Sequence, residues 1–280
     1  MNPDRFLRTF DVLDALADAP DGLRLTEISQ AVGAPVSSTH NLLQTMLAAE
    51  IIAATDDLHY TVGPRAVRIG IKIMNSLEVR TLGRRHLERL AKTLGNDVYL
   101  AVRVGDRIVY VDRFRGTQPV SVNIRIGDSL ALHATAAGKL YAAYEDDLRA
   151  RVLARPLRRL TSTTITEPEL LEAEFDRIRQ RGLSVSREEG YPGIFGIAVP
   201  VRDAAGTMAA AIHVSALSAG LDTDREDELI EQSRRTAADI QDDLGVHDLA
   251  ELVSPATVAP GSGPASATAT KSAKRRGAET

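Results

Sequence analysis

Cysteine and tryptophan are absent from this chain of 280 residues, and aromatic residues make up only 4% of it. Without cysteine there is no disulfide, no thiolate metal ligand and no cysteine nucleophile. The scarcity of aromatic side chains argues against base stacking as a way of holding single-stranded nucleic acid. No apolar run approaches the roughly 18 residues that a membrane helix needs, and the N-terminus lacks the pattern of a signal peptide. The sequence therefore predicts a cytoplasmic protein that does not enter a membrane.

Basic residues are scarce at the N-terminus and gather further along the chain. The formal net charge is −4, and acidic side chains outnumber basic ones in residues 1–62, which weighs against contact with nucleic acid. Residues 65–92 reverse the sign, with eight basic side chains against two acidic ones. A basic helix there would attract phosphates without regard to base sequence, but a solvated helix surface explains the same charges.

Two short helices joined by a tight turn are predicted for residues 25–48. Thr26 is expected to be the N-cap of the first helix, and Gly33-Ala34-Pro35 ends it. The second helix is expected to begin at Ser37 or Ser38. Its inner side carries apolar residues at helical spacing, namely Leu42, Leu43, Met46 and Leu47.

The outer side of this second helix is polar and carries no carboxylate. Ser37, His40, Asn41 and Gln44 are spaced i, i+3, i+4 and i+7. Asn and Gln can bond adenine bidentately in the DNA major groove, and Ser or His can reach a phosphate or a base edge. A polar solvated face is also common in helical proteins that do not bind DNA. The DNA-binding residues predicted for this domain are Thr26, Ser37, Ser38, Thr39, His40, Asn41 and Gln44.

The flanking segments complete a winged helix-turn-helix pattern. A first helix is predicted for residues 6–17, with Phe6, Phe10, Leu13 and Leu16 facing inward. After the helix pair, two short strands around residues 51–54 and 58–62 form a hairpin. The order of three helices and a hairpin predicts an N-terminal, largely all-α winged helix-turn-helix domain over residues 1–63.

A helical linker follows, beginning at Pro64 and extending to about Leu94, with a linker helix placed at residues 64–81. Ala66, Ile69, Ile73 and Leu77 form one apolar stripe, and further apolar residues form a second. This much apolar surface predicts a partner, most simply a second copy of the chain in a homodimer. The second linker segment ends at Gly95, a good C′ residue.

From Asp97 the hydrophobic period changes from helical to strand-like, which marks a second domain over residues 82–246. Strands and helices that mix in this way predict an α+β domain. Helix caps are expected at Thr135 and, as a Thr166/Glu169 capping box, before the helix at 168–181. Residues 250–280 are rich in Pro, Ala, Gly, Ser and Thr and are expected to be a disordered tail. The predicted strands are 98–102, 108–111, 120–126, 183–186, 194–201 and 208–214, and the predicted helices are 132–144, 145–154, 168–181 and 224–244.

Two segments of the second domain resemble signatures of the IclR family of bacterial transcriptional regulators. They are LHATAAGK at 132–139 and GLSVSREEGYPGIFGIAVPVRDAAG at 182–206, and the resemblance covers about residues 4–245. It implies a DNA-binding regulator with a GAF-like C-terminal effector-binding domain. The expected partners are a double-stranded DNA operator, a small organic acid as effector, and further copies of the chain, as a homodimer or a dimer of dimers.

The resemblance also implies which residues contact the effector. In addition, free N–H groups of Ala136, Ala137 and Gly138 at a helix N-terminus would suit an anion, although small residues there also permit close packing of helix on sheet. The chain has Gly196 where relatives have a Cys or similar residue, and this change is expected to enlarge the pocket for a ring or a longer acid. The predicted effector-binding residues are Ala136, Ala137, Gly138, Ser186, Gly196, His213 and Ser215.

Other departures from the family pattern leave the effector and the DNA contacts open. Ser186 stands where relatives have Asp, and His213 stands where they have Ser. In the DNA-binding domain, Val36 and Asn41 replace a basic residue and an Arg, so fewer phosphate anchors are expected. The acidic pair Asp56-Asp57 at the tip of the predicted hairpin is not expected to enter a groove.

The alternatives to a regulator are a GAF-like enzyme and a module that binds other proteins through its helix-turn-helix. The sequence has no G-x-S-x-G elbow, no H-E-x-x-H motif and no glycine-rich phosphate loop. We therefore expect no enzyme activity, no catalytic residue, no metal and no cofactor. A gel shift with operator DNA would separate a DNA-binding protein from both alternatives.

Overall fold

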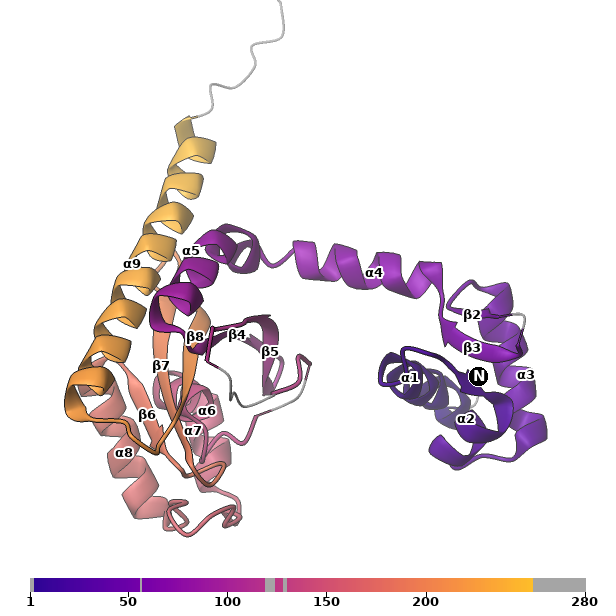
Figure 1. Ribbon diagram of the computed structural model, residues 1–280, viewed down its shortest axis with the longest axis horizontal. Helices are drawn as coiled ribbons and strands as arrows, with labels where there is room; N and C mark the ends of the chain where they lie inside the picture. Colours follow the sequence, from indigo (N-terminus) through magenta and orange to yellow (C-terminus); the bar gives the residue numbers. More distant parts are fainter. Residues whose placement is uncertain (1–2, 56, 119–123, 128–129, 254–280) are drawn as a thin grey trace, which may run out of the picture.

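The computed structural model describes residues 3–55, 57–118, 124–127 and 130–253. They form an N-terminal helical domain and a larger C-terminal domain, and the helix α4 connects them (Figure 1). Most of the strand predicted at 120–126 and the tail from residue 254 lie outside the described residues. Residues 250–253, which were placed in the tail, continue the last helix instead.

The N-terminal domain has the predicted order of three helices and a hairpin. A short strand β1 was not predicted, and it pairs with β3 through Leu23 and Tyr60. The resulting small sheet has the order β1-β3-β2. The elements are α1 (Pro3–Ala17), β1 (Leu23–Arg24), α2 (Leu25–Ala31), α3 (Val36–Ala48), β2 (Ile52–Ala54) and β3 (His59–Val62).

The core of this domain is formed by one stripe from each helix. Val12 and Leu16 of α1 pack with Ile28 of α2 and with Leu42, Leu43 and Met46 of α3. The prediction that Phe6 and Phe10 face inward is wrong, since both are about half exposed. Their rings meet each other edge to face, with centroids 5.4 Å apart. The stripe formed by Val12 and Leu16, one helical turn apart, faces the core in their place.

Both helix starts of the helix-turn-helix differ from the prediction by one or two residues. The N-cap of α2 is Arg24 and not Thr26, because the Arg24 N–H donates to Glu27 Oε2 at 2.7 Å. The helix α3 begins directly after Pro35, so Ser37 lies inside its first turn. The turn between the helices is tied by the Ser29 hydroxyl, which donates to Ala34 O at 2.6 Å.

The linker consists of two helices with a break between them. α4 spans Pro64–Asn75 and α5 spans Glu78–Leu94, so residues 78–81 belong to the second helix. None of the described side chains of α4 is buried within the chain. α5 ends at Gly95 as predicted, in the left-handed conformation with φ of 69°, which glycine adopts without strain.

The C-terminal domain is built on a five-stranded antiparallel sheet of order β5-β4-β8-β7-β6. Helices α5 and α9 cover one face, and α6 and α8 cover the other (Figure 1). The predicted inner side of α9, from Leu229 to Leu244, is buried on the sheet. The elements are β4 (Asp97–Val104), β5 (Arg107–Phe114), α6 (Ala136–Tyr144), α7 (Asp146–Leu153), α8 (Pro168–Arg181), β6 (Ser184–Arg187), β7 (Ile194–Arg202), β8 (Met208–Leu217) and α9 (Thr223–Val253).

Two of the three predicted helix ends in this domain are confirmed. Thr135 is the N-cap of α6, and its hydroxyl accepts from the Gly138 N–H at 3.1 Å. Gly182 ends α8 in the left-handed conformation. The Thr166/Glu169 capping box is wrong, because the N-cap of α8 is Glu167. The Thr166 hydroxyl instead donates to Glu167 Oε1 at 3.2 Å.

Candidate functional site

The outward face of α3 carries most of the polar side chains that the sequence predicted. Ser37, Ser38, His40, Asn41 and Gln44 are all exposed. Thr39 does not belong with them, because it is 1% exposed and its hydroxyl donates to Pro35 O at 3.1 Å. Position 39 lies on the same side of the helix as Leu42 and Leu43, which pack in the core. Thr26 is exposed in the first turn of α2.

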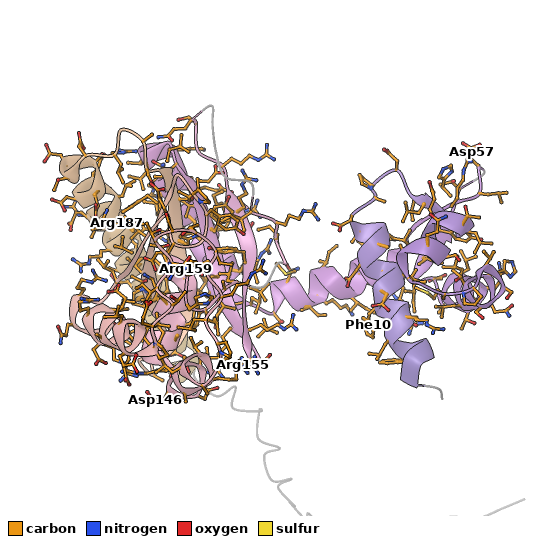
Figure 2. The ribbon with its side chains drawn as sticks, turned by 90° about the horizontal axis from the view of Figure 1, so that it is seen from below. Phe10, Asp57, Asp146, Arg155, Arg159 and Arg187 are labelled. Atoms are coloured by element: carbon orange, nitrogen blue, oxygen red, sulfur yellow. The ribbon has the colours of Figure 1, made fainter. Side chains whose placement is uncertain are left out.

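The hairpin that forms the wing ends in an acidic tip. Asp57 is exposed at the outer end of the N-terminal domain (Figure 2). Leu58 beside it has a positive φ of 59°, and the Thr55 N–H donates to His59 O at 2.8 Å, which makes the turn tight. The carboxylate of Asp57 would be repelled by phosphates.

A small cavity lies in the C-terminal domain between the start of α6 and the strands β6, β7 and β8. Its volume is about 40 Å³, and no Lys or Arg lines it. Four predicted effector residues meet there, namely Ala136, Ser186, Gly196 and His213. Three do not line it, namely Ala137, Gly138 and Ser215.

The amide groups at the start of α6 divide into used and unused ones. The N–H of Gly138 donates to the Thr135 hydroxyl, and that of Lys139 donates to Thr135 O. Gly138 is therefore not an anion ligand, contrary to the prediction. Its glycine is required by packing, since a Cβ would lie 2.6 Å from Ala131 O. Among the described residues, no partner is recorded for the N–H groups of Ala136 and Ala137, so two amides remain for an anion.

His213 is the polar centre of the cavity wall. It is 5% exposed, and its Nδ1 lies 2.5 Å from the Tyr110 hydroxyl oxygen. Burial lowers the pKa of His213 to about 4 and raises the pKa of Tyr110 well above its ordinary value, so both groups are neutral at pH 7. If the Tyr110 hydroxyl donates to Nδ1, then Nε2 carries the proton and is a hydrogen-bond donor.

The expectation that Gly196 enlarges the pocket is wrong. Gly196 of β7 lies one pair along the ladder from the pairing of Ala198 with His213. A Cβ at position 196 would be 2.8 Å from His213 Nε2. The imidazole therefore occupies the space that a side chain at position 196 would fill, and the cavity stays small.

The two serines of the predicted site have different surroundings. The Ser186 hydroxyl donates to Ala134 O at 3.1 Å, which ties β6 to the segment before α6. Ser215 is buried opposite Asp97 in the sheet, and no partner for its hydroxyl is recorded among the described residues. Ser186 is thus part of the cavity wall, whereas Ser215 lies further along β8.

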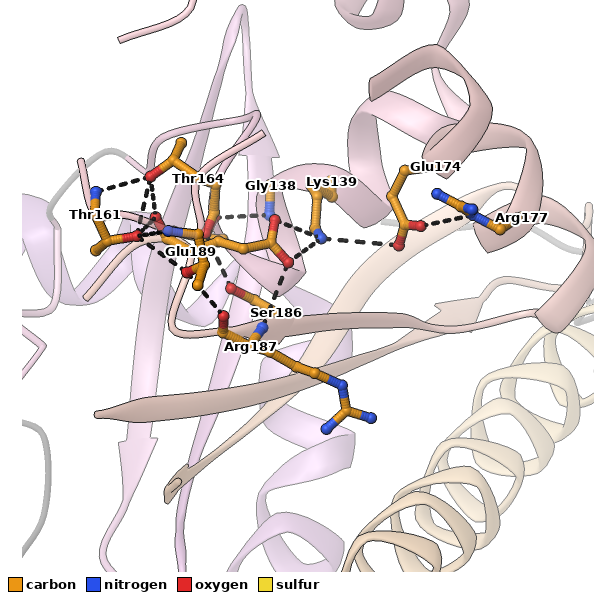
Figure 3. A network of polar contacts seen from close by, with 12 residues as sticks. Gly138, Lys139, Thr161, Thr164, Glu174, Arg177, Ser186, Arg187 and Glu189 are labelled. Carbon is orange, nitrogen blue, oxygen red and sulfur yellow. Dashed lines mark hydrogen bonds and ion pairs between the residues drawn. The ribbon is translucent and has the colours of Figure 1, made fainter. Parts of the chain in front are cut away.

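A buried ion pair that the sequence analysis did not single out lies next to the cavity (Figure 3). Lys139 is 0% exposed, and its Nζ contacts both carboxylate oxygens of Glu189 at 2.6 and 2.7 Å. The Thr164 hydroxyl donates to Glu189 O at 2.7 Å. Glu189 precedes Gly190 and Tyr191, which line the cavity. The ion pair therefore holds this part of the wall on α6; its signal in the sequence was one charged residue in each family segment.

A helix-turn-helix domain joined to a second domain with a small closed cavity defines a class, the ligand-responsive DNA-binding regulators. Residues 7–54 match the IclR helix-turn-helix domain, and residues 71–242 match the C-terminal domain of the bacterial transcriptional regulator IclR. The chain belongs to the IclR family of bacterial transcriptional regulators.

Individual relatives agree with this assignment. The chain is 31% identical to the probable transcriptional regulator SauR of Cupriavidus necator, over 78% of this chain and 88% of that one. The Thermotoga maritima IclR structure has a TM-score of 0.73 and 26% identity, covering 86% and 98% of the two chains. An IclR homologue from Microbacterium hydrocarbonoxydans, solved with 4-hydroxybenzoate, has a TM-score of 0.77 and 23% identity, covering 86% and 99%. The curated relatives are transcriptional regulators and not enzymes. Within the described residues, no helix is long and apolar enough to cross a membrane.

Proposed function

We propose that this regulator reads its operator with the exposed face of α3 and that a small organic monocarboxylate in the α6 cavity controls its grip on DNA. The observation that supports the first part most is the set of exposed, uncharged polar side chains on α3, which includes Asn41 and Gln44. We retain residues 1–63 as the DNA-binding unit and 82–246 as the effector-binding unit. Since bacterial operators lie in the cytoplasm, we place the protein there.

The proposed effector class follows from the chemistry of the cavity wall. Two amides at the start of α6 and the neutral His213 can donate hydrogen bonds, but no cationic side chain is present to balance a second negative charge. The Microbacterium homologue was solved with an aromatic monocarboxylate, which supports the same class. A ring needs about 150 Å³, so a cavity of about 40 Å³ must widen before it takes one.

The recognition-helix proposal is tested by substituting Asn41 and Gln44 with alanine. If either side chain bonds a base bidentately, the variant loses about 1–3 kcal/mol of specific affinity. We would select an operator from a random duplex library and measure binding by fluorescence anisotropy. Asn75→Ala, at the far end of α4, is the control. Wild-type affinity in both α3 variants would remove this face from base recognition.

We also propose that two copies of the chain pair along α4, in a dimer or a dimer of dimers. The side chains of Val67, Ile69, Ile71 and Ile73 are 47–59% exposed, and such a patch calls for a partner. A two-fold pair would present two α3 helices to a palindromic operator. Light scattering should give at least a dimer at micromolar concentration, and Ile69→Glu with Ile73→Glu should give monomers, whereas Arg68→Ala should not. A monomeric wild-type protein would end this proposal.

A further inference from the structure

The DNA-binding domain has very few cations with which to hold a polyanion. Residues 1–63 contain three basic side chains, Arg5, Arg8 and Arg24, and nine acidic ones. Neutralisation of phosphates by Lys and Arg supplies most of the sequence-independent affinity for DNA. The few arginines that lie near α3 must therefore matter more here than in a basic domain.

Arg8 lies beside the recognition helix, in a concave site between α1 and α3. This cavity has a volume of about 240 Å³ and is lined by Arg8 of α1, by Ser38 and Asn41 of α3, and by Val32 and Ala34 at the turn. Its lining contains no acidic residue. Its polar groups are therefore a guanidinium, a hydroxyl and an amide, all of which can donate to an anion.

The Arg8 side chain is available for a ligand. It is partly exposed, and no hydrogen bond or ion pair is recorded for it within the part of the chain that the structure describes. Other arginines of the chain are engaged; for example, Arg103 binds Glu145 and Arg113 binds Asp97. An unengaged guanidinium has the planar pair of donors that suits phosphate oxygens.

We propose that Arg8, together with Ser38 and Asn41, forms a binding site for one phosphodiester of the operator backbone, next to the groove that α3 enters. This rests on the proposed entry of α3 into the major groove. Asn41 then lies at the border between the base-reading face and the phosphate site. Arg8 supplies, from another helix, a cation that α3 itself does not carry.

The test is the salt dependence of DNA binding by the full chain, measured by fluorescence anisotropy with the selected operator and with a random 30-bp duplex. Loss of one phosphate contact should reduce the slope of log K against log salt by about 0.9. Arg8→Ala should show this reduction and bind the operator about tenfold more weakly. Arg8→Lys should keep the slope and recover part of the affinity. Ser38→Ala should weaken binding with the slope unchanged.

Arg155→Ala, an exposed arginine of the other domain, is the control and should leave both slopes unchanged. Arg8→Met keeps the aliphatic stem, so it should lose the same slope as Arg8→Ala if charge is the cause. An unchanged slope in Arg8→Ala and Arg8→Met, with wild-type operator binding intact, would overturn the phosphate site alone. Absence of operator binding in the wild-type chain would overturn both this site and the proposed role of α3.

Discussion

Replacing Lys139 by methionine is expected to lower the free energy of unfolding of the C-terminal domain by about 3–5 kcal/mol. Methionine matches the length of the lysine stem but leaves the Glu189 carboxylate without its cation. Both residues are buried, and the ammonium contacts both carboxylate oxygens. A buried charge that loses its partner cannot be rescued by water, which is why the loss is large.

The measurement is urea unfolding followed by circular dichroism, with the double variant Lys139→Met, Glu189→Met as the decisive control. A buried ion pair replaced by apolar side chains of similar size often costs little, so the double variant should be more stable than Lys139→Met alone. Arg235→Met breaks an exposed pair with Glu231 and should cost at most about 1 kcal/mol. If Lys139→Met costs no more than Arg235→Met, the ion pair does not stabilise the fold.

The same variant bears on the effector site. Glu189 is followed directly by Gly190 and Tyr191 of the cavity wall, and Thr164 holds its carbonyl oxygen. Without the ammonium of Lys139, this wall loses its buried tie to α6. Ligand affinity should therefore fall together with stability in Lys139→Met and should recover in part in the double variant.

The sequence predicted well what depends on neighbours along the chain. The cap at Thr135, the left-handed glycines at 95 and 182 and the inner side of α9 follow from local rules, and all are found. The phase of α3 was also right, apart from Thr39. Because a single helical turn separates the exposed face from the core, one residue at the border was assigned to the wrong side.

Features that depend on distant partners were not predictable in the same way. The hydrophobic pattern of α1 marks Phe6 and Phe10 as apolar, but it does not say whether an apolar side chain faces its own domain or another surface. The effect of Gly196 depends on the pairing of β7 with β8, which brings His213 over it. Lys139 and Glu189 are 50 residues apart, and no periodic pattern links two single charges over that distance.

The effector site itself predicts the largest change in affinity. A carboxylate on the N–H groups of Ala136 and Ala137 would place its charge beside the side chain of Ala136, which faces the cavity. Ala136→Asp puts a fixed negative charge there. Repulsion between two charges about 4 Å apart is on the order of 4 kcal/mol at an effective dielectric constant near 20, which is roughly a thousandfold in affinity.

Operator binding in the absence of effector should survive in Ala136→Asp, because α3 belongs to the other domain. Ala136 is buried, so the larger side chain also adds bulk, and Ala136→Asn is the control of nearly equal size. A thermal-shift screen of small monocarboxylates would first identify a ligand, and calorimetry would then compare the three proteins. Asn should weaken binding much less than Asp if the ligand's charge lies on these amides. Equal losses would mean that bulk alone excludes the ligand, and undiminished binding in both variants would place the effector away from the start of α6.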